Sequence, residues 1–260
     1  MTYPAADLTD RVVLLTGVVG DIGTAYLGAF TAAGAHVVAT DLPGLAEEGR
    51  RRTEAATASG PGRAVFVAAD ITDDAALDSA VATAVREFGG LHAVVNNAAV
   101  YRTLGGKRSL GELTNDEWDL VLRVNVRGPW QVIKAAAPAL AASGSGRIVN
   151  ISSVVARNGA PGFAHYVASK AAVEGLTRAA ARELGRDGTT VNTVSPGLVD
   201  DAASRDLNTA DYLTMVAGTR AVPRPMTPDD LVGAVLWLAG PSSGFVTGQV
   251  VIVDGGGVFA

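Results

Sequence analysis

The chain has 260 residues, of which 48% are hydrophobic and 5% aromatic, and its formal net charge at pH 7 is -5. This length suits one α/β domain with a large core, and a negative charge without a basic stripe argues against nucleic acid as a partner. The lack of cysteine excludes disulfides, a thiol nucleophile and a cysteine-ligated metal site, and three scattered histidines offer no metal-ligand spacing.

The first ten residues contain no apolar signal core, and no apolar run approaches the length of a membrane span. We therefore expect a cytoplasmic protein without a membrane partner.

The first predicted elements enclose a phosphate-binding loop. Residues 12–15 form an apolar, β-branched run that predicts a buried strand, and residues 24–33 predict a helix. Between them lies the run Thr16-Gly17-Val18-Val19-Gly20-Asp21-Ile22-Gly23. Glycines in such a loop let the backbone approach a pyrophosphate, and the helix N-terminus offers free N–H groups. The alternative is a plain turn between a strand and a helix.

The second predicted strand, residues 36–40, ends at Asp41. An acidic residue here can accept hydrogen bonds from both adenosine ribose hydroxyls and would repel a 2′-phosphate. The glycine loop contains no basic residue, and the arginines at 50–52 lie a helical segment further on, where we interpret them as a solvated face. These features favour NAD over NADP. Asp41 is also suited to capping a turn before Pro43-Gly44, and both roles can hold together.

Strand-like and helix-like segments then alternate along the chain. The further strands are predicted at 64–68, 91–95, 147–151, 190–194 and 250–253, and the helices at 45–58, 73–88, 115–141, 164–184 and 228–239. This alternation predicts an α/β fold: a Rossmann-type doubly wound parallel sheet of about seven strands with helices on both faces, in a single domain over 1–260. Two irregular stretches, 101–113 and 196–225, are predicted to form the pocket walls.

Tyr166 and Lys170 lie four residues apart in the helix predicted over 164–184. Residues i and i+4 share one face of a helix, so a phenol stands beside an ammonium. A nearby cation lowers a tyrosine pKa from its usual value of about 10, which suits the phenol to general acid–base catalysis. Taken alone, such a pair is more often two residues of a helix surface. The other motifs of the chain favour the catalytic interpretation of this pair over the alternative of two surface residues.

These motifs resemble, in kind and in order, those of the short-chain dehydrogenase/reductase family, in its single-domain branch. The ordered set is Thr16-Gly17…Gly23, Asp41, Asp70-Ile71, Asn96-Asn97-Ala98, Asn125, Ser152-Ser153, Tyr166 with Lys170, Pro196-Gly197 and Val253-Asp254-Gly255-Gly256. The resemblance covers nearly the whole chain. Ser153 lies thirteen residues before Tyr166, which is the family's spacing for its catalytic serine.

The resemblance implies an NAD-dependent oxidoreductase that transfers a hydride between a secondary alcohol, diol or polyol and its ketone. Tyr166 would act as general acid/base, and Lys170 would lower its pKa and bind ribose hydroxyls. Ser153 would hold the substrate oxygen, and Asn125 would position a water. The predicted cofactor-binding residues are Gly17, Gly20, Asp21, Ile22, Gly23, Asp41, Leu42, Asp70, Ile71, Asn97, Ala98, Tyr166, Lys170, Pro196, Gly197 and Val199. Asp70 would contact the adenine side, and Asn97 would line the cofactor channel.

Four departures from the family pattern bear on this interpretation. Asp21 stands where the single-domain branch has glycine and places a negative charge near the predicted pyrophosphate. Ala99 replaces the glycine after Asn-Asn-Ala. Asp201 stands where the family often has a threonine that contacts nicotinamide or phosphate. Ser204 is the candidate to make that contact instead. The stretch 101–113 is a few residues longer than the common form.

Two other functions stay open at this stage. One is an NADPH-type 3-ketoacyl reductase, against which Asp41 argues. The other is a dinucleotide-binding module without turnover, which Asp21 and Asp201 motivate and the intact set around Tyr166 opposes. Epimerase or dehydratase chemistry, as in the extended branch, is less favoured because the chain lacks an added substrate domain.

Two predicted helices, 115–141 and 164–184, carry more apolar side chains than one sheet face requires. Those of the first are Trp118, Val121, Leu122, Trp130, Val132 and Ile133. We predict that both helices pair with their copies across a two-fold axis, in a homodimer or, by the family resemblance, a homotetramer. The alternative is that both are buried within one subunit.

Overall fold

The fold is described from a computed structural model, which covers residues 7–259. Residues 1–6, which belong to the segment that we expected to lack a signal core, lie outside the described residues, as does Ala260. No helix within the described range is both long and apolar enough to cross a bilayer.

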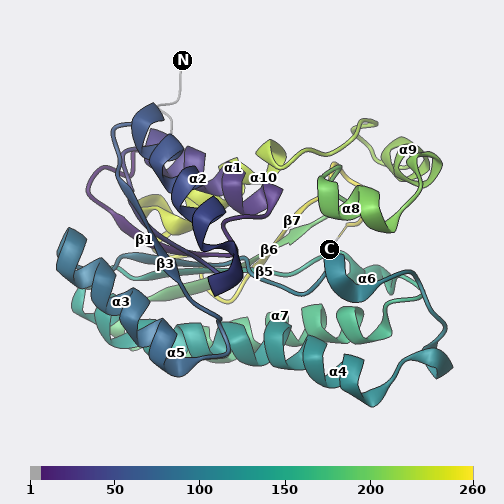
Figure 1. The fold of residues 1–260 in the computed structure, drawn as a ribbon, viewed down its shortest axis with the longest axis horizontal. Helices are drawn as coiled ribbons and strands as arrows, with labels where there is room; N and C mark the ends of the chain where they lie inside the picture. The colour runs from purple at the N-terminus through teal and green to yellow at the C-terminus, as the bar shows by residue number, and fades with distance from the viewer. Residues whose placement is uncertain (1–6, 260) are drawn as a thin grey trace.

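The described chain forms a seven-stranded parallel sheet in the order β3-β2-β1-β4-β5-β6-β7 (Figure 1). The strands are β1 (Val12–Thr16), β2 (His36–Asp41), β3 (Ala64–Ala68), β4 (Ala93–Asn96), β5 (Arg147–Ile151), β6 (Thr190–Pro196) and β7 (Val250–Val253). The order reverses between β1 and β4, and ligands of open α/β sheets bind beyond the carboxyl ends of strands at such a reversal. The predicted doubly wound sheet of about seven strands is confirmed.

Helices cover both faces of the sheet, as Figure 1 shows. One layer holds α1 (Asp21–Ala32), α2 (Ala46–Ser59) and α10 (Asp229–Ala239), and the other holds α3 (Asp74–Phe88), α5 (Gly128–Ala142) and α7 (Ala164–Leu184). Each layer contributes its own apolar cluster, so every residue of β1, β5 and β6 is buried between the two. Strands buried on both faces are typically rich in apolar residues, and β1 is such a run, whereas β5 and β6 also bury polar side chains.

The helix predicted over 115–141 is not one regular helix. It consists of α4 (Asn115–Leu122), a π-helical turn (Arg123–Arg127) and α5. Thr114 and Glu117 form a capping box that starts α4. The π turn contains Asn125, and single π turns inside α-helices often mark functional sites. Its effect here is to change the direction in which the Asn125 side chain points relative to an uninterrupted helix.

The prediction that 196–225 is irregular is wrong in part, because this stretch contains α8 (Ala202–Leu207) and α9 (Ala210–Gly218). Side chains cap both helices: Asp201 Oδ1 accepts from Ser204 N at 2.7 Å, and Thr209 Oγ1 accepts from Tyr212 N at 3.3 Å. The stretch 101–113 is irregular as predicted, with two short 3-10 turns. A further short helix, α6 (Val155–Asn158), follows β5.

Candidate active site

The glycine loop after β1 has the shape of a phosphate cradle. Gly17 has φ +72°, and an added Cβ there would lie 2.8 Å from the Ala98 Cα. At Gly23 an added Cβ would collide with the Gly17 carbonyl oxygen, whereas at Gly20 it would meet nothing nearer than 3.9 Å. No side chain caps the start of α1. Two glycines thus allow close packing of the backbone, and the third leaves open space beside free helix N–H groups, which fits a pyrophosphate.

Thr16 and Asn97 hold this loop against the end of β4. The Thr16 hydroxyl accepts from the backbone nitrogens of Asn97 and Ala98 at 3.1 and 3.0 Å. The Asn97 amide in turn donates to the carbonyl oxygens of Thr16 and Gly17, both at 3.0 Å. The Asn97 side-chain amide therefore stabilises the glycine loop through hydrogen bonds, a role that the sequence did not predict.

Asp41 stands beside the glycine loop at the end of β2. Its Oδ2 accepts from Val19 N at 2.8 Å, and its Oδ1 accepts from Leu42 N at 2.9 Å. The carboxylate therefore steadies both the loop and its own turn. Each oxygen keeps a second lone pair, which can accept from a ribose hydroxyl.

The interpretation of the three arginines at 50–52 as a solvated face needs correction. The side chain of Arg51 is 74% exposed, but that of Arg52 is only 24% exposed. Arg52 reaches back to α1, where it donates to Thr24 Oγ1, and its Nε donates to Glu48 Oε1 at 2.6 Å. A basic group therefore lies near the glycine loop, with its charge already paired to a carboxylate.

The residues after β3 pack against α5, where Gln131 Nε2 donates to Thr72 O at 3.2 Å. Asp70 Oδ1 accepts from both the nitrogen and the hydroxyl of Thr72 at 2.8 Å, which closes a turn. The Ile71 side chain is buried and packs where a Cβ on Gly128 would otherwise stand. Both positions thus shape the β3 end of the cleft.

Asn125 joins three elements at the centre of the molecule. Its Oδ1 accepts from Val100 N at 2.7 Å, and its Nδ2 donates to Val100 O at 3.1 Å and to Ser169 Oγ at 3.2 Å. The side chain is 1% exposed. Its partners come from the segment after β4 and from α7, so it is not satisfied within its own helix.

The structure brings Ser153, Tyr166 and Lys170 to the ends of β5 and β6. Lys170 Nζ donates to Ile151 O at 2.9 Å and lies 5.5 Å from the centroid of the Tyr166 ring. Ser153 Oγ makes two long contacts: it donates to Pro196 O at 3.5 Å and accepts from Val155 N at 3.4 Å. Such a weakly held hydroxyl is free to turn toward a substrate oxygen.

Ser152, the neighbouring hydroxyl, is used differently. It is 2% exposed and donates to the Lys170 carbonyl oxygen at 2.9 Å. This bond anchors α7 to β5 and leaves Ser153 as the hydroxyl open to a ligand, which supports the choice made from the sequence spacing.

The expected lowering of the Tyr166 pKa is wrong for the described structure. Burial raises the pKa of Tyr166 above its ordinary value, and the neighbouring Tyr101 and Asp201 raise it further. Burial also lowers the pKa of Lys170 to about 8. Both groups leave water together, so each loses solvation of its charged form, and proximity alone does not offset that loss.

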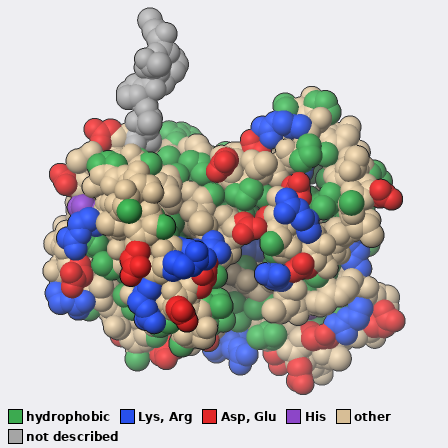
Figure 2. Space-filling view, turned by 45° about the horizontal axis from the view of Figure 1, so that its top comes forward, with side chains coloured by type: hydrophobic (Ala, Val, Ile, Leu, Met, Phe, Trp, Pro, Cys, Tyr) green, Lys and Arg blue, Asp and Glu red, His purple; other side chains and the backbone are tan. Residues whose placement is uncertain are grey.

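Tyr101 and α8 form the opposite wall. The ring of Tyr101 lies 5.2 Å from that of Tyr166, centroid to centroid. Arg102 Nε binds Asp206 Oδ2 at 2.6 Å, and Lys107 Nζ lies 3.8 Å from the centroid of the Tyr212 ring. The stretch 101–113 and the pair α8–α9 therefore meet across the cleft entrance, and Figure 2 shows this side of the molecule hollowed, with acidic and basic side chains mixed around the hollow.

The departures from the family pattern have definite places. Asp21 Oδ2 accepts from Ala202 N at 2.9 Å, so this carboxylate is used by the start of α8. Asp201 is buried as the cap of α8, and Ser204 is also buried, with its nitrogen bonded to that cap. Ala99 is exposed, so its methyl group has room.

The comparisons with known proteins agree with this geometry. A family model described as enoyl-(acyl carrier protein) reductase matches residues 17–257. The short-chain reductase NovJ of Streptomyces niveus is 37% identical, over 98% of this chain and 99% of its own. Galactitol 2-dehydrogenase of Agrobacterium fabrum is 33% identical, over 96% of this chain and 98% of its own. The crystal structure of a 3-oxoacyl-[acyl-carrier protein] reductase with bound NAD from Brucella melitensis has a TM-score of 0.86 at 33% identity, covering 98% of this chain and 93% of that one.

Fold and relatives together define a dinucleotide-binding oxidoreductase. The chain belongs to the short-chain dehydrogenase/reductase family, whose members bind a nicotinamide dinucleotide.

Proposed function

We propose that this protein is an NAD-dependent dehydrogenase that interconverts a secondary alcohol, diol or polyol and its ketone, in one catalytic domain over 1–260. The observation that carries the proposal is the meeting of Asn125, Ser153, Tyr166 and Lys170 at the strand ends beside the glycine loop. The relative named galactitol 2-dehydrogenase supports the substrate class.

Each side chain then has a chemical task. Ser153 donates to the substrate oxygen and holds it near the phenol, and Tyr166 takes the alcohol proton or returns it to a ketone. Lys170 binds ribose hydroxyls, and Asn125 holds a water toward Lys170. The dinucleotide, when bound, accepts or supplies the hydride. Because the pKa of Tyr166 is raised, the phenol stays protonated at neutral pH, which favours reduction there and oxidation at alkaline pH.

The preference for NAD rests on the end of β2. The Asp41 carboxylate would repel a 2′-phosphate, and the nearby Arg52 is paired with Glu48 and gives that phosphate no free cation. In the Brucella melitensis reductase, NAD is the bound dinucleotide.

One experiment separates this proposal from its alternatives. NADH formation is followed by absorbance with a panel of secondary alcohols, diols and polyols, and NADPH or NADH consumption with a 3-oxoacyl thioester. Turnover of an alcohol or polyol with NAD supports the proposal. Turnover of the thioester alone, with NADPH, would establish the ketoacyl reductase that the Brucella melitensis relative's name suggests. Tight NADH binding without turnover of any substrate would establish the binding module.

We also propose that the active protein is a homodimer or homotetramer. A hollow of about 510 Å³ lies on α4, the π turn, α5 and α7, lined by Leu122, Val126, Arg127, Trp130, Ala172 and Leu176. Trp130 is 46% exposed, whereas Val121, Val132 and Ile133 are buried within the subunit. An exposed tryptophan beside an apolar hollow suits a self-complementary interface. A monomer mass by light scattering at micromolar concentration would reject this proposal.

A further inference from the structure

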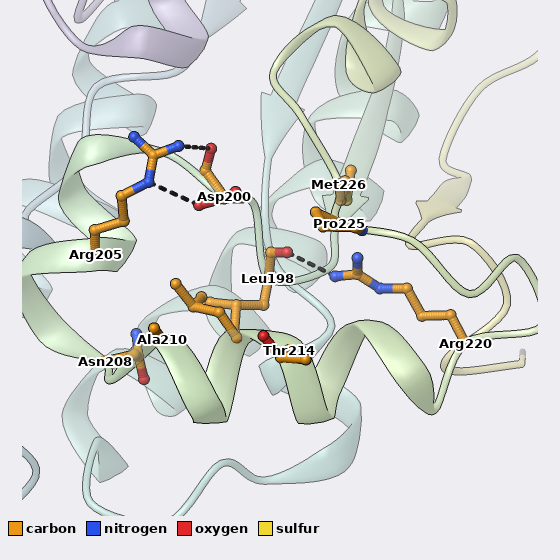
Figure 3. A pocket seen from close by; sticks show the side chains of 10 residues that line it. Leu198, Asp200, Arg205, Asn208, Ala210, Thr214, Arg220, Pro225 and Met226 are labelled. Atoms are coloured by element: carbon orange, nitrogen blue, oxygen red, sulfur yellow. Dashed lines mark hydrogen bonds and ion pairs between the residues drawn. The ribbon is translucent and has the colours of Figure 1, made fainter.

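A second cavity lies beside α8 and α9, away from the catalytic side chains. Its volume is about 400 Å³, within the range of roughly 300–1,000 Å³ that is common for small-molecule sites. Its walls are Leu198, Asp200, Arg205, Asn208, Ala210, Leu213, Thr214, Arg220, Pro225 and Met226 (Figure 3). Asn125, Ser153, Tyr166, Lys170 and the glycine loop take no part in this lining.

The cavity and the catalytic cleft use largely different side chains of α8 and α9. Toward the stretch 101–113 these helices present Asp206 and Tyr212, which contact Arg102 and Lys107. Toward the cavity they present other residues, among them Leu213 and Thr214. The two hollows therefore share little of this small helical unit, apart from Asn208, which lines the cavity and also interacts with the Tyr101 side chain.

Arg220 is the unusual member of this lining. It is 7% exposed, and burial lowers the pKa of its guanidinium. Its NH2 donates to Leu198 O at 2.6 Å and its NH1 to Arg224 O at 2.9 Å, so its described partners are neutral carbonyl groups. Figure 3 shows this guanidinium reaching from one end of the cavity toward the Leu198 carbonyl. The guanidinium has more N–H donors than these two bonds use.

No carboxylate within residues 7–259 forms an ion pair with this guanidinium, although the nearby Asp254 and Asp230 partly offset the lowering of its pKa by burial. The carboxylate oxygens of Asp254 accept hydrogen bonds from the backbone nitrogens of residues 256–258. Asp230 binds Arg224 through both of its oxygens. Burial still outweighs the effect of these two carboxylates on the Arg220 pKa. A buried cation that is only partly compensated is costly, and a carboxylate of a ligand in direct contact with the guanidinium would reduce that cost.

The rest of the lining narrows the ligand class. Arg205, the other cation of the cavity, is paired with Asp200 at 2.8 Å, so that end carries no net charge. Leu198, Leu213 and Met226 supply apolar surface between the two ends. One unpaired cation with apolar walls fits a singly charged anion with a short hydrocarbon body better than a phosphate dianion.

We propose that this cavity is a second binding site for a small organic monocarboxylate, with Arg220 binding the carboxylate and Leu198, Leu213 and Met226 contacting its hydrocarbon chain. This site is separate from the proposed reaction centre and does not depend on the proposed function. Because α8 also carries Asp206, which contacts Arg102 at the cleft, a bound carboxylate would steady the wall of the active site.

Calorimetric titration of the purified full-length protein tests the proposal, with butyrate, hexanoate and benzoate as probes and hexanamide as the neutral match. We expect at least one carboxylate to bind, hexanamide to bind roughly tenfold more weakly than hexanoate, and saturating NADH to leave carboxylate binding in place. Equal binding of hexanamide, loss of binding under NADH, or no binding by any carboxylate overturns the proposal.

Variants locate the binding. Arg220→Met should weaken carboxylate binding by roughly tenfold or more, and Arg220→Lys should restore part of it. Thr214→Leu should also weaken binding by filling the cavity without touching Arg220, which keeps the test decisive if Arg220→Met fails to fold. Arg205→Met removes a cation from the same lining that is already paired, and should change binding less than about threefold. If the Arg220 variants lose thermal stability but still bind the carboxylate, Arg220 only ties Leu198 to Arg224 and the proposal is wrong.

Discussion

The two walls of the catalytic cleft are held by different kinds of interaction. On the strand side the bonds are buried: Asn96 donates to Asn150 at 2.8 Å, Asn150 donates to Thr177 at 2.8 Å, and Lys170 donates to Ile151. On the α8 side the ion pair that links α8 to the stretch 101–113, Arg102 with Asp206, has side chains that are 64% and 48% exposed. Buried polar networks hold one geometry, whereas exposed pairs contribute at most about 1 kcal/mol. The strand-side wall, which carries Lys170, is thus rigid before a ligand arrives, whereas the α8-side wall, which would contact the substrate, is loose.

The two neighbouring tyrosines, Tyr166 on the strand side and Tyr101 on the other side of the cleft, provide the test with the largest expected effect. Tyr166→Phe removes the proton carrier but keeps the ring, so we expect turnover to fall by roughly 10²–10⁴-fold while NADH binding and folding persist. Tyr101→Phe is the matched control, because it removes the same hydroxyl from the other ring of the pair, and we expect a far smaller loss. Steady-state rates with the substrate that the panel identifies give the comparison. Wild-type turnover by the Tyr166 variant would refute the assignment.

The next largest expected effect concerns dinucleotide binding at Asp41, at the cofactor end of the rigid, strand-side wall. NADH should bind more tightly than NADPH by roughly 1–3 kcal/mol, because Asp41 leaves a 2′-phosphate facing a carboxylate. Asp41→Ala should narrow this gap, whereas Asp70→Ala, at the end of the neighbouring strand, should leave it unchanged. Fluorescence titration with both dinucleotides measures it, and equal affinities for the wild-type protein would contradict the proposed preference.

Burial of the lysine predicts how stability depends on pH. The folded pKa of Lys170 is about 8, below its ordinary value of 10.5, so between these values the unfolded chain holds a proton that the folded chain has lost. The free energy of unfolding therefore gains a contribution as pH rises through this window. Lys170→Met lacks that contribution, so its stability relative to wild type should fall by about 2 kcal/mol between pH 7 and pH 9.5.

Urea unfolding of both proteins at the two pH values checks this. The variant also loses the hydrogen bond from Lys170 to Ile151 at both pH values. Subtracting the stability difference at pH 7 from that at pH 9.5 removes this constant loss. A difference that does not change with pH would show that the ammonium is better solvated than its burial implies.

Local signals made the rigid wall predictable from the sequence. The strands at Ala64–Ala68, Arg147–Ile151 and Val250–Val253, and the helix Ala164–Leu184, begin and end where we predicted them. Two of these strands are continuous apolar runs, the strand Arg147–Ile151 is apolar at three of its five positions, and the helix has a sustained helical period. The spacing of Tyr166 and Lys170 is itself local, so one helix suffices to place both residues on the same face.

The loose wall was less predictable because its contacts are distant in the chain. The helices α8 and α9 have 6 and 9 residues, too few for a clear period, and only their caps, Asp201 and Thr209, signal them. The bond between Asp21 and Ala202 joins residues 181 positions apart and follows from the strand order. The raised pKa of Tyr166 depends on burial by several elements, which no spacing reveals.

The smallest expected effect is the one that tests the loose wall directly. Arg102→Ala and Asp206→Asn each remove one partner of the exposed pair across the cleft entrance. If the pair contributes the usual 1 kcal/mol or less, KM for the substrate should rise by at most about fivefold, with kcat and the affinity for NADH unchanged. Since both residues act through one contact, the double variant should be no worse than either single variant, and the coupling energy should be measurable at low salt and shrink at high salt. Arg86→Ala, which breaks an exposed pair with Glu87 on α3, is the matched control for the loss of a surface charge. A large fall in kcat for Arg102→Ala would mean that α8 positions the reacting groups as firmly as the strand ends do, and the contrast between the two walls would then be wrong.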